Sequence, residues 1–327
     1  MKTPVCILTA DNKPLNNLIT SRIMTVSVTD NRADEADQIN ITLNDHDGAL
    51  ELPKRGVKIN CKLGWLGEPL HDKGDFIVDG TELGGPPDVM TIRGSSANFR
   101  SNIKTAKSKS FHGQTLGVIA QSVAKEHNLK LNINGQLASI AIQHVDQTNE
   151  SDLNFLKRLA KQNGAEMTIK KDRLLIFQAG SGLSASGKNL QSFTIARSKG
   201  DQWRYAEEDR DSDHTGVAAK YQDKGDAKAK KVTAGQEGKI KTIKGTFANK
   251  DEAQRAAEAE KQKIDREKAT FSFNTAYGVP EVSTETPVII QGFKKQADKL
   301  KWIVAKATHN YNSSGGLSTQ LEMEANI

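Results

Sequence analysis

Residues 57–95 contain the stretches Val57-Lys-Ile-Asn-Cys-Lys-Leu63, Phe76-Ile-Val-Asp-Gly80 and Val89-Met-Thr-Ile92. Residues 288–325 contain Val288-Ile-Ile-Gln-Gly-Phe293, Trp302-Ile-Val-Ala-Lys306 and Thr319-Gln-Leu-Glu-Met323, in the same order. Each block reads as an apolar strand, a charged loop, an aromatic-Ile-Val strand and a final alternating strand. We therefore expect two similar β modules in one polypeptide, with generic strand patterning as the alternative explanation.

The size and composition of the chain indicate a soluble protein of two or three domains. It has 327 residues, a net charge of +6 and 26% charged residues. No apolar run approaches the roughly 20 residues that a membrane helix requires. The two cysteines, Cys6 and Cys61, lie in strand-like sequence and are expected to be reduced core residues. The first residues read as a β-strand, because their apolar part is too short for a secretory signal.

The first hundred residues predict only β structure, and helical periodicity begins after a polar stretch at 101–110 that resembles a linker. We expect helices over 116–127, with Leu116, Ile119, Ala120, Val123 and Ala124 on one face, and over 149–163, with Asn149 as N-cap. A hairpin at 166–177 and a glycine-serine linker at 180–187 follow. Further strands are expected at 193–196, 203–206 and 217–221.

Two later segments have distinctive compositions. Residues 220–247 hold eight lysines and four glycines, and predict a solvated, mobile loop. A nucleic-acid surface is the alternative, but it would need aromatic residues interleaved with the lysines. Residues 249–268 give the longest helix signal, with Asn249 as cap and a stripe of small residues at Ala253, Ala256 and Ala257.

The expected fold is mainly β with α+β insertions: two similar barrel-like β domains, a small α+β module and one long exposed helix. Residues 1–105 form the first barrel-like domain and residues 106–185 the α+β module of two helices and a hairpin. Residues 186–327 form the second barrel-like domain, which includes the lysine-rich loop and the helix. As an alternative, the strands near 190–221 complete the first barrel.

No catalytic, cofactor-binding or metal-binding residue is assigned, and the chain is not expected to be an enzyme. Asp45-His46-Asp47 and the pair His144 and Asp146 each offer two metal ligands without a third. Asp209-Arg-Asp211-Ser-Asp213 begins like a calcium loop, but His214 and Lys220 stand where a glycine and a bidentate glutamate are needed. Gly180–Lys188 lacks the hydroxyl residue of a phosphate-binding loop, and the carboxylates of 207–209 lie in a solvated cluster.

Several separated segments resemble one family in the same order. Gln147-Thr-Asn-Glu-Ser-Asp-Leu-Asn-Phe155-Leu-Lys-Arg-Leu-Ala-Lys-Gln-Asn-Gly164 is similar to the signature segment of the phage late-control D proteins. A similar segment occurs in the VgrG spike proteins of type VI secretion. The stretch from Val26 to Asp37, Leu52-Pro-Lys-Arg-Gly56 and Leu63-Gly-Trp65 resemble the first β domain of that family. The resemblance extends over nearly the whole chain.

This resemblance implies a structural hub of a contractile phage-type tail baseplate, located in the virion tail or a phage-tail-like particle and assembled in the host cytoplasm. It implies a homotrimer that presents pseudo-sixfold symmetry to the hexameric tail tube protein and holds a trimeric central spike protein. Other baseplate proteins are further expected partners. The tape-measure protein or DNA in the lumen is a possible transient contact, and the excess lysines are expected away from that bore.

Two other functions fit parts of the sequence. The two helices and short strands of 111–179 resemble a peptidoglycan-binding module, although Phe155 falls on the buried stripe. A cell-wall-degrading baseplate enzyme is the third possibility, and it would need a desolvated acid in a cleft.

Overall fold

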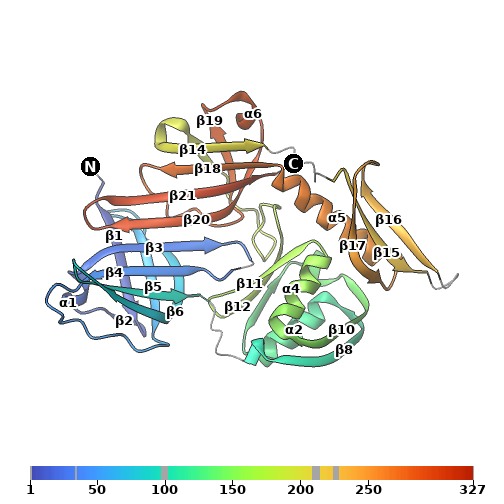
Figure 1. Cartoon of the computed structure of the whole chain (residues 1–327), viewed down its shortest axis with the longest axis horizontal. Coiled ribbons are helices and arrows are strands. Elements are labelled where there is room, and N and C mark those ends of the chain that lie inside the picture. The colour runs from blue at the N-terminus through green and yellow to red at the C-terminus, as the bar shows by residue number, and fades with distance from the viewer. Residues whose placement is uncertain (1, 34, 97–101, 208–213, 224–227, 327) are drawn as a thin grey trace.

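The computed structural model describes residues 2–33, 35–96, 102–207, 214–223 and 228–326. Two β modules lie one above the other at one end of the molecule (Figure 1). An α+β module lies beside the first of them, and a small sheet covered by a long helix occupies the opposite end (Figure 1). The mainly β fold with α+β insertions, predicted from the sequence, is confirmed. No described helix is long and apolar enough to span a bilayer.

The first β module contains six main strands, hydrogen-bonded in the order β3-β4-β7-β6-β5-β1 among the described residues. A short strand β2 (Lys13–Pro14) and helix α1 (Asn17–Thr20) flank β1. The bounds are β1 Pro4–Ala10, β3 Ile23–Asn31, β4 Gln38–Asn44, β5 Lys58–Trp65, β6 His71–Gly84 and β7 Val89–Ser95.

The second β module also has six main strands in the described chain, in the order β14-β18-β21-β20-β19-β13. A short helix α6 (Lys295–Asp298) lies between β19 and β20, and the turn η2 (Arg197–Lys199) precedes β14. The bounds are β13 Phe193–Ala196, β14 Gly200–Glu207, β18 Ala269–Thr275, β19 Pro287–Gln291, β20 Trp302–Asn312 and β21 Gly316–Ala325. Taken in chain order, the strands of the two modules therefore occupy the same places in their sheets.

The two modules also share two register shifts. The register of β6 on β7 shifts between Val78 and Gly80, and that of β20 on β21 shifts between Val304 and Lys306. The register of β3 on β4 shifts after Ile23, and that of β14 on β18 shifts after Gly200. Such bulges are local, structure-specific features of a ladder. Their recurrence favours duplication over generic patterning as the origin of the sequence likeness.

The connection into the fourth strand repeats as well. Gly56 has φ +89° and its N–H donates to Val78 O over 2.8 Å. Glu285 has φ +67° and its N–H donates to Val304 O over 2.9 Å. Glutamate adopts this left-handed backbone at an energetic cost that glycine avoids. The second module thus keeps the backbone of the first with a charged residue at the glycine position.

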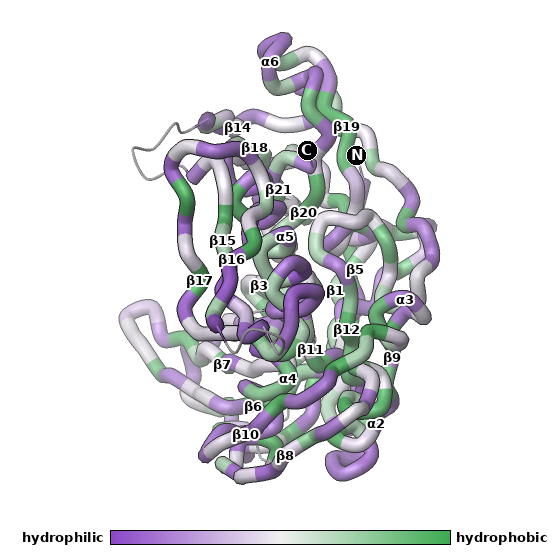
Figure 2. Tube along the Cα trace, turned by 90° about the vertical axis from the view of Figure 1, so that its right-hand side faces the viewer, coloured by the Kyte–Doolittle hydropathy of each residue, from purple (hydrophilic) through white to green (hydrophobic). Residues whose placement is uncertain are grey.

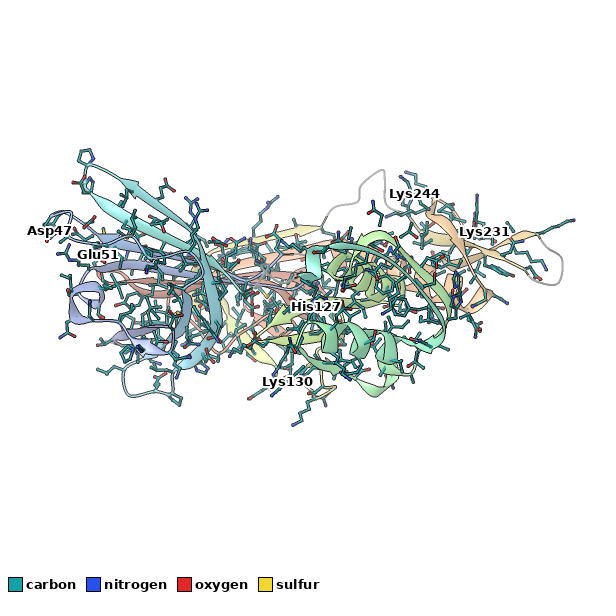
Figure 3. All side chains as sticks on the ribbon, turned by 90° about the horizontal axis from the view of Figure 1, so that it is seen from below. Asp47, Glu51, His127, Lys130, Lys231 and Lys244 are labelled. Carbon is teal, nitrogen blue, oxygen red and sulfur yellow. The ribbon has the colours of Figure 1, made fainter. Side chains whose placement is uncertain are left out.

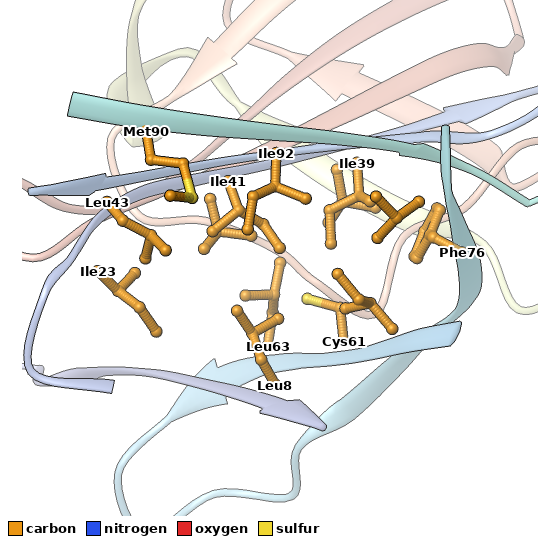
Figure 4. Packing of buried hydrophobic residues seen from close by; sticks show 14 of the residues in the cluster. Leu8, Ile23, Ile39, Ile41, Leu43, Cys61, Leu63, Phe76, Met90 and Ile92 are labelled. Atoms are coloured by element: carbon orange, nitrogen blue, oxygen red, sulfur yellow. The ribbon is translucent and has the colours of Figure 1, made fainter. Parts of the chain in front are cut away.

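One strand pair joins the modules. The second half of β20 pairs antiparallel with β3, from Lys306 opposite Asn31 to Asn312 opposite Thr25. This pairing fuses both modules into one 13-stranded sheet. Each module keeps its own apolar core; part of the first is shown in Figure 4. The edge strands differ, since β1 is antiparallel to β5 but β13 is parallel to β19.

The alternative in which strands near 190–221 complete the first barrel is wrong. β13 pairs with β19, and β14 pairs with β18, so both belong to the second module. β15 (Gly216–Gln222) belongs to neither module, because it pairs with β16 and β17 of the small sheet.

The α+β module is built around one apolar cluster that includes Phe155. Its helices are α2 (Leu116–Glu126), with the predicted buried face, and α4 (Asp152–Gln162). Ser151 caps α4, whereas the predicted cap Asn149 has φ +46° and lies in an irregular part of β10. The remaining elements are η1 Asn102–Lys104, β8 Ala106–Thr115, β9 Lys130–Ile133, α3 Gly135–Ala138, β10 Ala141–Ser151, β11 Ala165–Lys170 and β12 Arg173–Gln178.

Two segments expected to lack regular structure are strands. Residues 106–110 of the polar stretch 101–110 lie in β8, which pairs with β10, and residues 102–104 form η1. The lysine-rich segment 220–247 supplies β16 (Ala229–Gly235) and β17 (Ile240–Phe247), which flank β15. The lysine-rich segment forms strands and not a loop because buried and exposed residues alternate along it. Val232 and Ala234 are buried, while lysines such as Lys231 point outward at the far end of the molecule (Figure 3).

The predicted long helix is confirmed as α5 (Lys250–Glu267), capped by Asn249. Ala253 and Ala257 are fully buried against β15 and β16, because their small side chains allow the helix to lie close to the sheet. The opposite face of α5 carries charged residues. Along strands of the sheets, hydrophilic and hydrophobic residues alternate (Figure 2).

We expect Trp302→Ala to lower the free energy of unfolding by about 3–5 kcal/mol, because it leaves a large cavity in the second core. Trp302 is fully buried, and its Nε1 donates to Ala297 O over 3.1 Å. Leu66→Ala is the control, since Leu66 is 72% exposed and its loss should change stability by less than about 0.5 kcal/mol. Urea denaturation followed by circular dichroism measures both. Equal stability of the two variants would contradict the core described here.

Candidate functional site

A cluster of buried charges lies where the modules meet, at the end of β3. β3 contributes Asp30 and Asn31, and the chain then passes through Arg32 toward Asp37. β11 of the α+β module contributes Lys170. The segment before β19 adds Thr284 and Glu285, β21 adds Glu324 and α5 adds Arg266. We call these residues the junction cluster; it touches every part of the fold except the small sheet.

Lys170 is the centre of one half of the cluster. Its Nζ donates to Asp30 Oδ1, to Asn31 O over 3.1 Å, and lies 3.0 Å from Asp37 Oδ1. Asp30 Oδ2 also accepts from Thr284 N over 3.0 Å. One lysine of the α+β module is thereby bound to both carboxylates of the first module, and one of these carboxylates is bound to the second module.

Arg32 is the centre of the other half. Its Nε lies 2.6 Å from Glu285 Oε1, and its Nη1 lies 2.6 Å from Glu324 Oε2. Glu285 Oε2 accepts from Gly180 N over 2.8 Å, which attaches the linker after β12. The left-handed glutamate that replaces the glycine of the first module therefore supplies a carboxylate to the junction.

The environment shifts the pKa values of the two aspartates in opposite directions. Burial disfavours the charge of Asp30, but the ammonium groups of Lys170 and Lys73 and two hydrogen bonds lower its pKa to about 2. Burial raises the pKa of Asp37 to about 6, because the charge of Lys170 only partly compensates for it. Burial lowers the pKa of Lys73, whose Nζ donates to Pro280 O over 3.1 Å.

A cavity of about 270 Å³ adjoins the cluster. It is lined by charged groups that already bind one another and by the apolar residues Leu175, Phe177, Leu183 and Leu190. A perturbed carboxyl beside a cavity is a candidate general acid. Asp37, however, accepts from Asn31 N over 2.9 Å through Oδ1, the same oxygen that lies 3.0 Å from Lys170 Nζ, so Oδ1 is engaged inside the fold. The arrangement is suited to holding modules together.

The metal-ligand pairs considered in the sequence gain no third converging ligand among the described residues. Asp45 and Asp47 bind Arg22, with Asp47 Oδ1 at 2.5 Å from Nη1. His144 gains a neighbour, His112, whose Nδ1 lies 3.0 Å from His144 Nδ1. Asp146 contacts the other nitrogen of His144, over 3.1 Å, so the three groups do not converge on one point. Residues 209–213 lie outside the described residues.

One group not singled out from the sequence has ligand spacing: Glu126, His127 and Asp152 bring their ligand atoms within 4.8 Å of one another. Lys107 Nζ donates to Glu126 and, over 2.7 Å, to Asp152. Because this ammonium supplies the positive charge that a cation would bring, the group is a closed ion-pair network. It explains why an aspartate begins α4 with its side chain buried.

Gly180–Lys188 does not form a phosphate-binding loop. Gly187 N donates to Ser184 O and Lys188 N donates to Ser184 Oγ, so backbone donors are used within the turn. The junction cluster is not evident in the sequence, although Asp30, Asn31, Arg32 and Asp37 lie in the segment that carries the family resemblance. The available signal was a pair of polar residues ending the alternating strand Val26–Val28, which resembled an ordinary turn.

We expect Asp37→Asn and Asp30→Asn to change the pH dependence of stability in opposite senses. Asp37 binds its proton more tightly in the folded chain, so its contribution is present below about pH 4 and is lost as the pH rises through 6. Asp37→Asn should remove that loss. Between pH 4 and 7 the free energy of unfolding of the variant should therefore rise by about 3 kcal/mol relative to that of the parent.

Asp30 binds its proton less tightly in the folded chain, so its contribution is present above about pH 4 and is lost toward pH 2. Asp30→Asn should lower the free energy of unfolding by about 2 kcal/mol at pH 7 and by progressively less at acid pH. Urea denaturation at pH 3, 4, 5.5 and 7 checks both changes. Parallel stability curves for the two variants would show that these carboxylates are not coupled to folding.

Solved structures with a similar fold include tail proteins and a chain of a PdpA–VgrG complex. A tail protein from Neisseria meningitidis MC58 superposes with a TM-score of 0.72 at 13% identity, covering 98% of this chain and 96% of that one. A chain of the Francisella PdpA–VgrG complex gives a TM-score of 0.56 at 11% identity, covering 100% of this chain and 58% of that one. At these identities the likeness shows a shared fold.

Sequence comparison gives the family. The "probable baseplate hub protein" of Escherichia phage P2 is 38% identical over 99% of this chain and 94% of its own length. That of Escherichia phage 186 is 36% identical over 99% of this chain and 93% of its own length. The model of the family described as phage tail baseplate hub (GPD) matches residues 74–315. The chain belongs to the phage tail baseplate hub family.

Proposed function

We propose that three copies of this chain form a ring that joins the hexameric tail tube to the trimeric spike of a contractile tail. The observation that carries this proposal is the repeated β module: the same strand order and two shared register shifts, twice in one chain. Full-length likeness to probable hub proteins supports the location in the virion tail baseplate.

The physical reason is symmetry. A threefold ring with one contact module per chain would offer equivalent partners to only half of the six tube subunits. Two similar modules per chain offer six near-equivalent surfaces, while the chains themselves remain threefold for the spike. In this proposal the strands of residues 1–105 and, within residues 186–327, those of 193–207 and 269–325 provide the ring. Residues 106–185, together with α5, face other baseplate proteins.

The role proposed for the chain is structural, without catalysis. The buried charges of the junction cluster bind one another across modules, as an assembly scaffold requires. Phe155, which a carbohydrate-binding groove would need at the surface, is fully buried and stacked on Phe111 at 5.2 Å between ring centroids. The lysine-rich β16 and β17 lie at the far end from the first module (Figure 3), which suits an outward position away from a DNA-filled bore.

Native mass spectrometry of the full chain, alone and with a trimeric spike protein, tests the ring. The expected species is a trimer, formed either by the chain itself or upon addition of the spike. Obligate interfaces of this kind bury well over 2,000 Å² per pair, so the trimer should survive dilution to about micromolar concentration. A stable dimer with spike present would contradict the proposal.

Cell-wall assays separate the structural role from its rivals. We expect the purified chain to leave a cell-wall suspension turbid and to remain in the supernatant after the wall is pelleted. A known lysozyme and a known peptidoglycan-binding domain serve as positive controls. Clearing of the suspension would favour a cell-wall-degrading component, and co-sedimentation would favour a peptidoglycan-binding one.

A further inference from the structure

Among the strand edges that lack a neighbour in the described residues, two belong to β6 and β14 of the β modules. β5 pairs with β6 only as far as Ile77 of β6. Beyond the bulge, residues 80–84 of β6 pair only with β7. β14 pairs only with β18. The hairpin of β6 and β7 stands out from the body of the molecule (Figure 3), and Leu83 on it is 58% exposed. Exposed edges of this length are sites for strand addition.

Inside the chain, the corresponding edges are already paired with each other. β20 occupies the same place in the second module as β6 does in the first. β19 pairs with β20 only as far as Ile303 of β20, so β20 also runs past its neighbour. β3 occupies the place of β14. The extension of β20 pairs with β3, so the internal junction shows what the extension of β6 and the edge of β14 are built to do.

We propose that β6 of one copy pairs antiparallel with β14 of the next copy, repeating the internal β20–β3 junction. The shared bulges set the register, because Gly80 corresponds to Lys306 and Gly200 corresponds to Ile23. Transferring the β20–β3 register gives a list of four opposed pairs: Thr81 with Glu207, Glu82 with Ala206, Leu83 with Tyr205 and Gly84 with Arg204.

The side chains fit this register. In β3, Val26 and Val28 are 0% and 1% exposed, whereas Trp203 and Tyr205 in the same places of β14 are only half-buried. Leu83 would cover Tyr205 and remove both apolar surfaces from water. On the other face Glu82 would lie diagonally across from Arg204, which places opposite charges within reach of each other.

Because the two edges belong to different strands, the contact between copies is head-to-tail. Such a contact closes into a ring only if a full turn is a whole-number multiple of the rotation between neighbouring copies. This inference rests on the proposed ring and specifies its chain-to-chain joint. It commits to a second copy of this chain as the occupant of both edges, because an equivalent joint already exists within the chain.

Disulfide trapping tests the register. Leu83→Cys and Tyr205→Cys would be combined in a chain carrying Cys6→Ser and Cys61→Ala, incorporated into tail particles, and oxidised. Leu83→Cys with Arg204→Cys is the matched control, because its two side chains would point to opposite faces of the joint. A second pair of opposed positions, Glu82→Cys with Ala206→Cys, tests the same register in case the geometry at the first matched pair is unfavourable for a disulfide.

The expected result is a ladder of covalent dimers and trimers for at least one matched pair, at ten-fold or greater yield than for the control. Particles mixed from single-cysteine chains should also give dimers, which would show that the bond joins two copies. A trimer in native mass spectrometry with neither matched pair cross-linked would overturn this joint and leave the ring intact. A covalent ladder extending beyond three chains would support the joint and contradict the threefold ring.

Discussion

The antiparallel pairing of β3 with β20 determines the architecture of the molecule. Each β module is an open sheet folded around its own core, and a free edge of either would invite non-specific strand addition. By pairing the edge of the first module with the extension of the second, the chain uses one edge from each and fixes the modules in a defined register. The bulges in β6 and β20 bend both strands at equivalent points, so both extensions leave their modules in the same way.

The junction cluster supports this pairing at one end, where Asn31 lies opposite Lys306. Buried ion pairs contribute little net stability, because desolvation offsets most of the attraction between the charges. Their geometry is nevertheless demanding, since an unpaired buried charge is costly. Arg32 therefore favours one placement of Glu285 and Glu324, and Lys170 favours one placement of the α+β module. The left-handed backbone of Glu285 is a local strain that this network holds in place.

Much of the fold could be predicted because strand and helix periodicities are local. The strand block 76–80 and its counterpart 302–306 were visible as a repeated aromatic-Ile-Val pattern, and the alanine face of α5 followed from helical spacing. The lysine-rich segment was mistaken for a loop because Val232 and Ala234 are outnumbered by charges, and their burial depends on α5, which comes later in the chain. The sequence does not separate Asn149, the predicted cap, from Ser151, because both are good caps and only the bulge in β10 decides between them. The junction cluster could not be predicted, because its members come from segments up to 292 residues apart, as with Arg32 and Glu324.

We infer that the step from one module to the next is the same within a chain and between chains. A cryo-electron microscopy map of the hub in an intact tail measures both steps directly. The expected map shows six β modules around one axis, each rotated from its neighbour by one sixth of a turn, whether or not the two belong to one chain. A map in which only one module per chain lines the ring, or in which the two kinds of step differ widely, would contradict it.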